Sequence, residues 1–575
     1  MKRFLIAILL IICGLTATEK AYAQYYSWGT DPTSFRWRQI KSDKYRIVYP
    51  DTAKNIAPRM ALYLDAVQED IAYGYRHRQM SIPFVVHPAN MQSNGLVMWL
   101  PKRVEFLSSP SISGYSMPWT KQLVAHEYRH AVQYNNLNRG LVKILSYVIG
   151  QQSSTIGLQF MPLWMMEGDA VMSETEMSTF GRGLQPSFSM AYRAYGNVTE
   201  CFPNRDKWFC GSYKDYIPNH YQLGYFICRH GYNRYGRIIG NDMAELTARR
   251  PYMVISNSWV FKKLYGTTQP RLFDDTFNTL HEHWQQMPQI AQSTSAIATP
   301  ETTCYTTYSH PIALDNGAIV ALKEDLDQSS RFVVIEAESG REHKLLSTGI
   351  ISSRPILSSS GRLWWTEYRR SPLFAQKVSS KICYLDSNAK RAKSLKTKGN
   401  ILYVTPTHDD KVSWVEYNIN GSYTIVRDAL ADEPIRTTIA DGKEIHGMAW
   451  DNSTDALYII ITDDDGMHIA TLDNGELRAV TRPAYTTLSD LRAKDGKLYF
   501  GSIASGRDEL HYFDIATGKE YQLSTSTYGS FSPAPYFDNS VIATSYDKRG
   551  YMPVMQTITT DREVKYRPMP ETTLL

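Results

Sequence analysis

The sequence predicts a multidomain protein in which a mixed α+β domain precedes an all-β domain built as a six-bladed propeller. The chain has 575 residues, enough for two or more domains that each bury a core of their own. Apolar residues follow both helical and strand periodicity up to about residue 287. Beyond about residue 291 the helical spacing ends, and short alternating strands separated by Asp, Asn, Gly and Ser turns recur about every 44 residues.

The first 23 residues predict a secretory signal peptide. They contain two early cations, an apolar run over residues 4–12 and the sequence Ala21-Tyr22-Ala23, after which cleavage is expected before Gln24. The apolar run is too short to span a bilayer, and no later stretch predicts a transmembrane span in the mature chain. The protein is therefore expected to be exported, and to be periplasmic, outer-membrane-associated or secreted.

Residues 24–287 form the predicted α+β domain, in which strands come first and helices follow. The predicted elements, in chain order, are a strand region at 36–50, a helix at 52–75, strands at 81–88 and 93–106, and helices at 123–136, 141–152, 163–177 and 220–236. The apolar stretch 141–152 is short and contains Lys143, which favours a buried helix. The stretch Ser93–Pro101 ends in proline, which is typical of an edge strand.

The predicted helix at 123–136 contains the motif HEYRH, in which two histidines lie four residues apart. On a helix this spacing puts His126 and His130 one turn apart on the same face, where both imidazoles can bind one metal ion. Glu127 lies beside them and is expected to act as the general base on a metal-bound water. A catalytic zinc site also needs a third protein ligand, which must come from another segment.

That third ligand is expected to be Glu167, within the stretch PLWMMEGDAVMSETE. Trp164, Glu167, Gly168 and Ala170 match the pattern W-x-x-E-G-x-A, and together with HEYRH this resembles the gluzincins, the thermolysin and aminopeptidase N class of zinc metallopeptidases. The resemblance implies a zincin-like fold, a Zn2+ cofactor and hydrolysis of peptide bonds. The small Gly168 is expected to let its helix approach the helix that carries the histidines.

Three features depart from the gluzincin pattern. The second histidine and the ligand glutamate are about twice as far apart in sequence as in the best-known members, which predicts an inserted helix and loop. Arg129 lies inside the motif, and its charge needs a partner such as Asp169 or Glu174. Val171 stands where thermolysin-like enzymes have an aspartate that orients a histidine, so another acid or a backbone carbonyl must take that role.

Peptide hydrolysis also needs a hydrogen-bond donor for the developing oxyanion. In gluzincins a later helix supplies a tyrosine or a histidine, and the stretch SYKDYIPNHYQLGYF offers Tyr216, His220 and Tyr221. We expect Tyr221 to fill this role, with His220 as the next candidate. The alternative is that these aromatic residues only pack the core.

Residues 304–575 form the predicted propeller, after a linker at 288–303 that is rich in Thr, Ser, Ala and Gln. Similar strands begin at Ala318, Arg362, Lys411, Ala456, Lys497 and Ser540. A period of about 44 residues suits blades of four strands. The units resemble the six-bladed propeller of the Tol system's periplasmic protein and its WD40-like relatives, with a β-sandwich or a solenoid as the alternative.

Together these features predict an exported zinc metallopeptidase that acts on a peptide or protein substrate, with a propeller that recruits the substrate or an envelope protein partner. The alternative is an envelope binding or scaffold protein whose zinc site is inactive or structural, because propellers host many functions. A formal charge of +5, with scattered basic residues, argues against a nucleic-acid partner. Cys201 and Cys210 flank a short loop, where they form either a disulfide or two free thiols.

Overall fold

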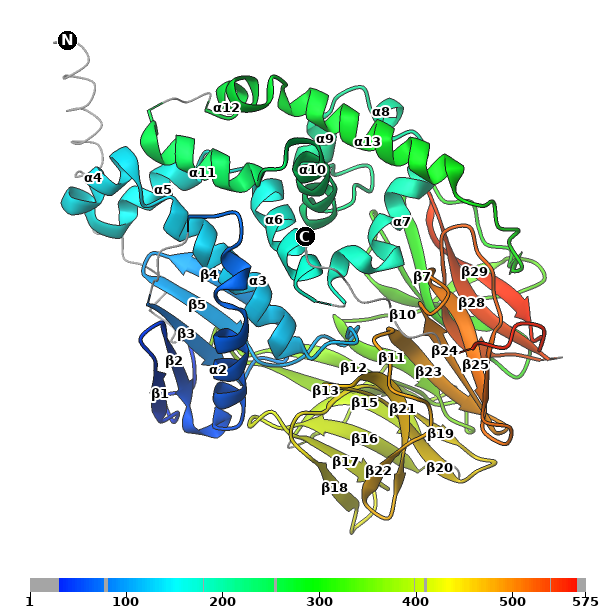
Figure 1. The fold of residues 1–575 in the computed structure, drawn as a ribbon. Coiled ribbons are helices and arrows are strands. Elements are labelled where there is room, and N and C mark those ends of the chain that lie inside the picture. The colour runs from blue at the N-terminus through cyan, green and yellow to red at the C-terminus, as the bar shows by residue number, and fades with distance from the viewer. Residues whose placement is uncertain are drawn as a thin grey trace.

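The computed structural model describes residues 30–76, 81–178, 180–252, 256–397, 399–407, 411–537 and 539–565. Figure 1 shows an N-terminal unit of helices and one sheet, coloured blue to green, beside a β-propeller coloured green to red. The predicted signal peptide at residues 1–23 lies outside the described residues. Within the ranges above, no helix is long and apolar enough to cross a membrane.

The N-terminal unit contains a five-stranded mixed sheet with the strand order β1-β2-β3-β5-β4. Its strands are β1 (Trp37–Lys41), β2 (Tyr45–Pro50), β3 (Ile82–His87), β4 (Asn94–Trp99) and β5 (Lys102–Leu107). Strands β2, β3 and β5 are parallel, whereas β1 and β4 run antiparallel to their neighbours. The stretch 93–106, for which the sequence predicts either a strand pair or one long strand, is a hairpin, and β4 lies at the sheet edge as the sequence predicts.

Helices cover this sheet and extend from it toward the propeller (Figure 1). They are α2 (Ile56–Val67), α3 (Trp119–Asn136), α4 (Gly140–Ile149), α5 (Ser153–Leu158), α6 (Leu163–Glu176), α7 (Pro186–Tyr195), α8 (Val198–Cys201), α9 (Asp206–Cys210), α10 (His220–Tyr235), α11 (Ile239–Arg249), α12 (Ser256–Tyr265) and α13 (Gln269–Gln286). Short 3-10 turns are η2 (Asp51–Ala53), η3 (Asp70–Ala72), η4 (Gly150–Gln152) and η5 (Arg182–Leu184). Cys201 and Cys210, which end α8 and α9, are free thiols.

Helix α3 is enclosed by its neighbours, because the sheet, α2, α6 and α11 all contact it. Val124 and Ala131 are fully buried, and Tyr128 stacks on Phe84 of β3 with ring centroids 6.3 Å apart. Burial of each large apolar side chain contributes about 1.5–3 kcal/mol. The same enclosure means that the buried polar side chains of α3 must find partners, since an unpaired buried polar group costs about 1–3 kcal/mol.

Helix α4 corrects the prediction of a buried helix at 141–152. Ile144, Tyr147 and Val148 are 62%, 78% and 82% exposed, and Val142 is the buried residue of the helix. The apolar sequence of α4 indicates a helix face that would be stabilised by burial. It does not indicate whether another part of the chain covers that face. Helices α4 and α5 occupy the insertion predicted between the second histidine and the ligand glutamate.

The C-terminal unit is a six-bladed propeller, as predicted, with four antiparallel strands in each blade. The innermost strands contact one another in a closed ring. They are β7 (Thr306–Ala313), β11 (Ile351–Leu357), β15 (Asn400–Pro406), β19 (Glu444–Asp451), β23 (Leu488–Lys494) and β27 (Ser530–Pro535), in blades one to six. The sequence repeat marks the second strands, which are β8 (Ile319–Asp325), β12 (Leu363–Arg370), β16 (Val412–Tyr417), β20 (Ala456–Asp463), β24 (Lys497–Ser502) and β28 (Ser540–Asp547).

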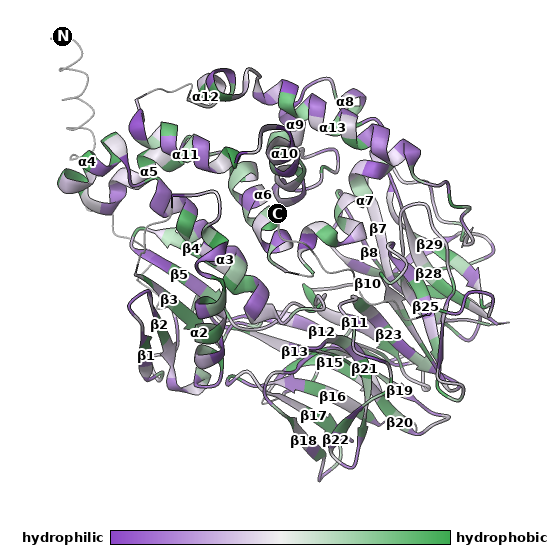
Figure 2. Cartoon of the chain, in the orientation of Figure 1, coloured by the Kyte–Doolittle hydropathy of each residue, from purple (hydrophilic) through white to green (hydrophobic). Residues whose placement is uncertain are grey.

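The outer strands complete each blade. They are β9 (Arg331–Ile335), β10 (Glu342–Ser347), β13 (Val378–Leu385), β14 (Lys393–Ser394), β17 (Tyr423–Arg427), β18 (Ile435–Ile439), β21 (Gly466–Asp473), β22 (Glu476–Ala479), β25 (Glu509–Asp514), β26 (Lys519–Gln522) and β29 (Gly550–Thr557). Apolar segments of the blade strands are visible in green in Figure 2. They form cores between blades, as where Trp364 and Ile382 of blade two pack with Trp414 of blade three.

The propeller is closed by a strand from the segment predicted as a linker. Within residues 288–303, β6 (Ser295–Ala296) pairs with β29 and becomes the outermost strand of blade six. Ser293 stabilises the pairing of β6 with β29, because its hydroxyl donates a hydrogen bond to Oε1 of Gln556 over 2.7 Å. Thr/Ser-rich composition alone did not reveal this pairing, since a strand of two residues carries no periodicity.

The segment 108–118, between β5 and α3, lies against the propeller. Tyr417 and Thr462 donate hydrogen bonds from their hydroxyls to the carbonyls of Ser108 and Tyr115, over 3.0 and 3.3 Å. At the end of the segment, the backbone N–H of Trp119 faces both carboxylate oxygens of Glu444, each 2.9 Å away. Helix α3 has no side-chain cap within its own segment. The propeller therefore supplies the negative charge that the first turn of α3 favours.

Replacing Glu444 with alanine is expected to lower the free energy of unfolding of the N-terminal unit by about 1 kcal/mol, the usual effect of losing a helix N-terminal cap. Hydrogen exchange of the first-turn amides of α3 measures the change directly. Glu476→Ala, on an exposed strand of the same propeller, serves as the control and should leave α3 unchanged. Unaltered exchange of α3 in the Glu444→Ala protein would show that the cap contributes nothing.

Candidate metal centre

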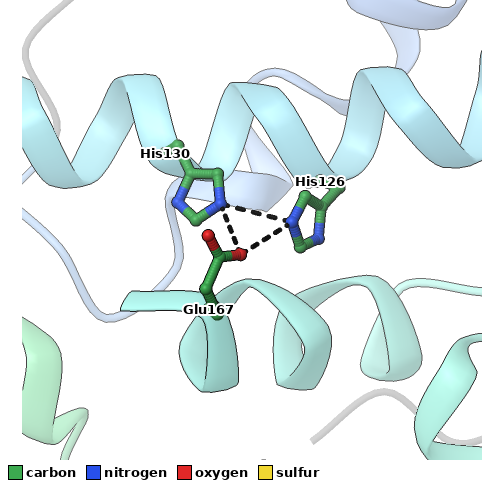
Figure 3. A group of neighbouring side chains, drawn as sticks. All are labelled: His126, His130 and Glu167. Atoms are coloured by element: carbon green, nitrogen blue, oxygen red, sulfur yellow. Dashed lines mark hydrogen bonds and ion pairs between the residues drawn. The ribbon is translucent and has the colours of Figure 1, made fainter. Parts of the chain in front are cut away.

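His126 and His130 of α3 and Glu167 of α6 bring three ligand atoms together (Figure 3). Oε2 of Glu167 lies 3.2 Å from Nε2 of His126 and 3.0 Å from Nε2 of His130, and the two nitrogens are 3.2 Å apart. Two imidazole nitrogens and one carboxylate oxygen are the donor set of a gluzincin-type zinc site. The three predicted ligands thus converge, although α4 and α5 separate them in the chain.

Each histidine is held through its other ring nitrogen. Nδ1 of His126 lies 3.0 Å from Oε2 of Glu174, and Nδ1 of His130 lies 2.8 Å from Oε1 of Gln133. Because the amide oxygen of Gln133 only accepts, the hydrogen bond assigns the hydrogen of His130 to Nδ1 and turns its Nε2 toward Glu167. Nδ1 of His126 faces both the accepting carboxylate of Glu174 and, 2.8 Å away, the donating Nη2 of Arg182. These contacts hold both rings in the orientation that a metal ligand needs, with each Nε2 directed at Glu167.

Glu174 takes the orienting role that Val171 cannot fill. Its carboxylate is fully buried, and it accepts from Nε and Nη2 of Arg182 over 2.6 and 2.9 Å. Burial alone would raise the pKa of Glu174, but the charge of Arg182 and the hydrogen bond from His126 lower it to about 2. Glu174 is therefore a carboxylate at neutral pH. Arg182 was not predicted, because it lies on η5 after α6 and belongs to no local motif.

The three candidate ligands lie in a region of negative potential. Burial lowers the pKa of His130, but the carboxylates of Glu167 and Glu127 outweigh it and raise the pKa to about 9. In the same way the two imidazoles outweigh burial and hold the pKa of Glu167 far below its usual range. Such a set of groups stabilises a positive charge at their centre, which a metal cation supplies.

Glu127 lies on α3 with its side chain directed toward the edge of the sheet. It is 5% exposed, and burial raises the pKa of its carboxyl group. A Cβ atom on Gly95 of β4 would lie only 2.5 Å from Oε1 of Glu127. The carboxylate therefore lies against the face of edge strand β4, where Gly95 leaves room for it.

Tyr221 and His220 begin α10, whose first turn is capped by the side chain of Asn219. The ring of Tyr221 lies 6.0 Å from that of His126 and 5.0 Å from the guanidinium carbon of Arg182. Burial and Glu167 raise the pKa of Tyr221 to about 12, whereas burial lowers the pKa of His220. Both rings are near the metal ligands. Tyr216, in contrast, stacks on Tyr305 of the propeller at 4.0 Å.

Gly168 corrects the prediction about helix packing. A Cβ atom there would overlap the backbone of Gly224 on α10, and a Cβ atom on Gly224 would overlap the carbonyl of Trp164. The glycine therefore brings α6 close to α10 and not to α3. This contact places the start of α10, with Tyr221, beside Glu167.

Arg129 is paired as the sequence requires, and its partner is Asp169. The fully buried guanidinium donates from Nε and Nη2 to the two carboxylate oxygens over 2.9 and 2.7 Å. Nη1 donates to the carbonyls of Ile71 and Tyr73. Asp169 also accepts from Nε2 of Gln133 over 2.7 Å, so this ion pair supports the residue that orients His130.

No family model and no curated protein matches the chain. Among solved structures, acylaminoacyl peptidase from Pyrococcus horikoshii is 12% identical, with a TM-score of 0.31, and the match covers 45% of each chain. The β-propeller domain of the Trilobed protease from Pyrococcus furiosus is 13% identical, with a TM-score of 0.30 over 45% of this chain and 97% of that one. A protein of unknown function from Dyadobacter fermentans is 11% identical, with a TM-score of 0.34 over 47% and 100%. At these scores the similarities carry no information about activity.

Proposed function

We propose that this protein is an exported, zinc-dependent metallopeptidase of the gluzincin type. The observation that supports this most strongly is the convergence of His126, His130 and Glu167 next to the buried carboxylate of Glu127. The Nε2 atoms of both histidines face Oε2 of Glu167, and the donor set is one that zinc prefers. A zinc ion bound there would supply Lewis acidity, which polarises the scissile carbonyl and makes a water molecule more acidic.

Glu127 would accept the proton of the attacking water and later donate it to the leaving amine. Its raised pKa suits this exchange, because a general base works best when its pKa approaches the operating pH. A peptide paired with edge strand β4 would lie beside this carboxylate.

Tyr221 would donate a hydrogen bond to the oxyanion that develops on the substrate carbonyl. With a pKa of about 12 its hydroxyl keeps its proton at neutral pH, and a neutral phenol is a donor. His220 is the second candidate for this role, because it begins the same helix and its ring centroid lies 4.6 Å from that of Tyr221. The propeller would recruit substrate or an envelope protein partner.

The purified mature protein is expected to contain about one zinc ion per chain and to hydrolyse peptides, and a chelator should abolish the hydrolysis. The His126→Ala protein should retain less than about 0.1 zinc per chain, because a site of three protein ligands cannot spare one. Metal content is measured by elemental analysis and hydrolysis with a peptide library.

The exposed His343, on β10, provides a matched control, and His343→Ala should keep both zinc and activity. Equal zinc content in the His126→Ala and wild-type proteins would refute the metal assignment. A protein that binds zinc but cleaves no peptide would instead support the structural or scaffold role.

A further inference from the structure

The central channel of the propeller contains a cluster of charged side chains that the proposed peptidase site does not use. In a ring of six blades, blades two and five face each other across the axis. Arg354 on the innermost strand of blade two nevertheless reaches Asp490 on that of blade five, with Nη1 3.3 Å from Oδ1. A Cβ atom on Gly447 of blade four would lie 3.4 Å from Nη2 of the same arginine. Arg354 therefore crosses the channel.

Further residues complete this cluster from blades one, five and six. Ser532 donates to Oδ2 of Asp490 over 2.7 Å and lies 3.4 Å from Nδ1 of His310. His310, Asp490 and Ser532 have φ angles of 52°, 57° and 53°, each at a break in the pairing of an innermost strand. Non-glycine residues adopt this left-handed backbone conformation at a cost in free energy. Here the conformation occurs at the breaks that bring the three side chains together. The cluster therefore lies across the channel and joins blades one, two, five and six.

A funnel-shaped cavity leads from one mouth of the channel toward this cluster. Glu444, the first residue of β19, contacts α3, so the innermost strands begin on the side of the N-terminal unit. A cavity of about 270 Å3 lies at the opposite end, and residues near the ends of all six innermost strands line it. Its walls include Ile312, Ile356 and Ala534, and Arg492 also lines it. A funnel whose base is crossed by side chains favours the end of a molecule over a chain that passes through.

The cluster has an excess of positive charge. Asp490 is engaged by Arg354 and Ser532. Arg492 has no carboxylate within ion-pair distance among the described residues, and its Nη2 donates to the carbonyl of Pro355 over 2.7 Å. Nη1 of Arg354 forms the ion pair with Asp490 but makes no hydrogen bond within the described residues. His310 adds no charge, because burial lowers its pKa to about 4.

Burial and the neighbouring Arg354 also lower the pKa of Arg492, to about 9. A buried cation that no carboxylate neutralises is costly, and an anionic group supplied by a ligand removes that cost. A planar carboxylate is the group that a guanidinium binds best, through two parallel hydrogen bonds.

We infer that the funnel at the far mouth of the propeller binds the free C-terminal carboxylate of a peptide, with Arg492 as the anion-binding residue and the apolar wall around the last side chain. The ligand class follows from three features: a positive group at the base, apolar sides and side chains that cross the base. The site is separate from the metal centre and does not depend on its activity. It gives the propeller a means of holding a peptide by its end.

The test compares binding of two fluorescein-labelled tetra-alanine peptides, one with a free carboxylate and one with a carboxamide, by fluorescence polarisation. The full-length mature Glu127→Gln protein keeps the probes intact. The free acid is expected to bind at least about tenfold more tightly than the amide, the scale of a charge-assisted hydrogen-bond pair. Arg492→Gln should remove this preference, and Arg492→Lys should retain part of it.

Lys344→Gln, at an exposed position of β10 outside the cavity lining, is the matched control and should change the preference by less than about twofold. Circular dichroism melting checks that each variant is folded. If the Arg492→Gln protein does not fold, the ratio of the two peptide affinities for the Glu127→Gln protein still tests the proposal. Equal affinity for the acid and the amide overturns it. Binding of inorganic phosphate without a preference for the peptide acid overturns it as well.

Discussion

Replacing Glu127 with glutamine is expected to slow peptide hydrolysis by about a hundredfold or more while zinc content stays at about one ion per chain. Glutamine has almost the same shape as glutamate, so it fills the space against Gly95, but its amide cannot take a proton from water. The three ligand atoms come from other residues and remain in place. The measurement is kcat/KM on a peptide that the wild-type protein cleaves, with zinc determined on the same sample.

The loss of activity has to be compared with the effect of the same substitution at a carboxylate that has no catalytic role. Glu69→Gln serves that purpose, because the side chain of Glu69 is 83% exposed and pairs with Lys44 on the surface. It should keep full activity, since exposed ion pairs contribute about 1 kcal/mol or less. Wild-type kcat/KM in the Glu127→Gln protein would exclude Glu127 as the base. Loss of zinc together with activity would mean that Glu127 holds the metal site together.

The convergence of the three candidate ligands could be predicted from sequence because its information is local. The four-residue spacing of His126 and His130 fixes their relation on any helix, and the residues around Glu167 mark a second helix of known type. The orienting groups could not be predicted in the same way. Gln133 lies one turn beyond His130, where many residue types are compatible with a helix, and Arg182 reaches Glu174 only after a change of chain direction at η5.

The propeller was predictable for a different reason, since each blade repeats one pattern and the repeat averages over divergent residues. What the repeat did not predict is how the ring closes and what covers it. Strand β6 has two residues, and the contact between Glu444 and α3 joins segments 325 residues apart. The exposure of α4 belongs to the same class, because burial depends on packing partners that periodicity does not identify.

Replacing Asp169 with asparagine is expected to destabilise the N-terminal unit by about 3–5 kcal/mol, the effect of leaving one partner of a buried ion pair uncompensated. Arg129 is fully buried, and its guanidinium lies 4.6 and 4.5 Å from the ring centres of Tyr73 and Tyr75. Because its side chain is 0% exposed, solvent cannot hydrate the positive charge that the substitution leaves without a carboxylate. Hydrogen exchange of the α3 and α6 amides measures the change in local stability.

The same substitution should weaken zinc binding, because Asp169 accepts from Gln133 and Gln133 holds His130. Asp275→Asn is the control, since Asp275 pairs with Arg234 on the surface and should affect neither property. A double variant in which Arg129 becomes Met and Asp169 becomes Leu removes both charges, and it should recover part of the stability but not the zinc affinity. If Asp169→Asn instead retains wild-type protection and zinc, the arginine within HEYRH is only a tolerated substitution, and the orientation of His130 depends on Gln133 without further support.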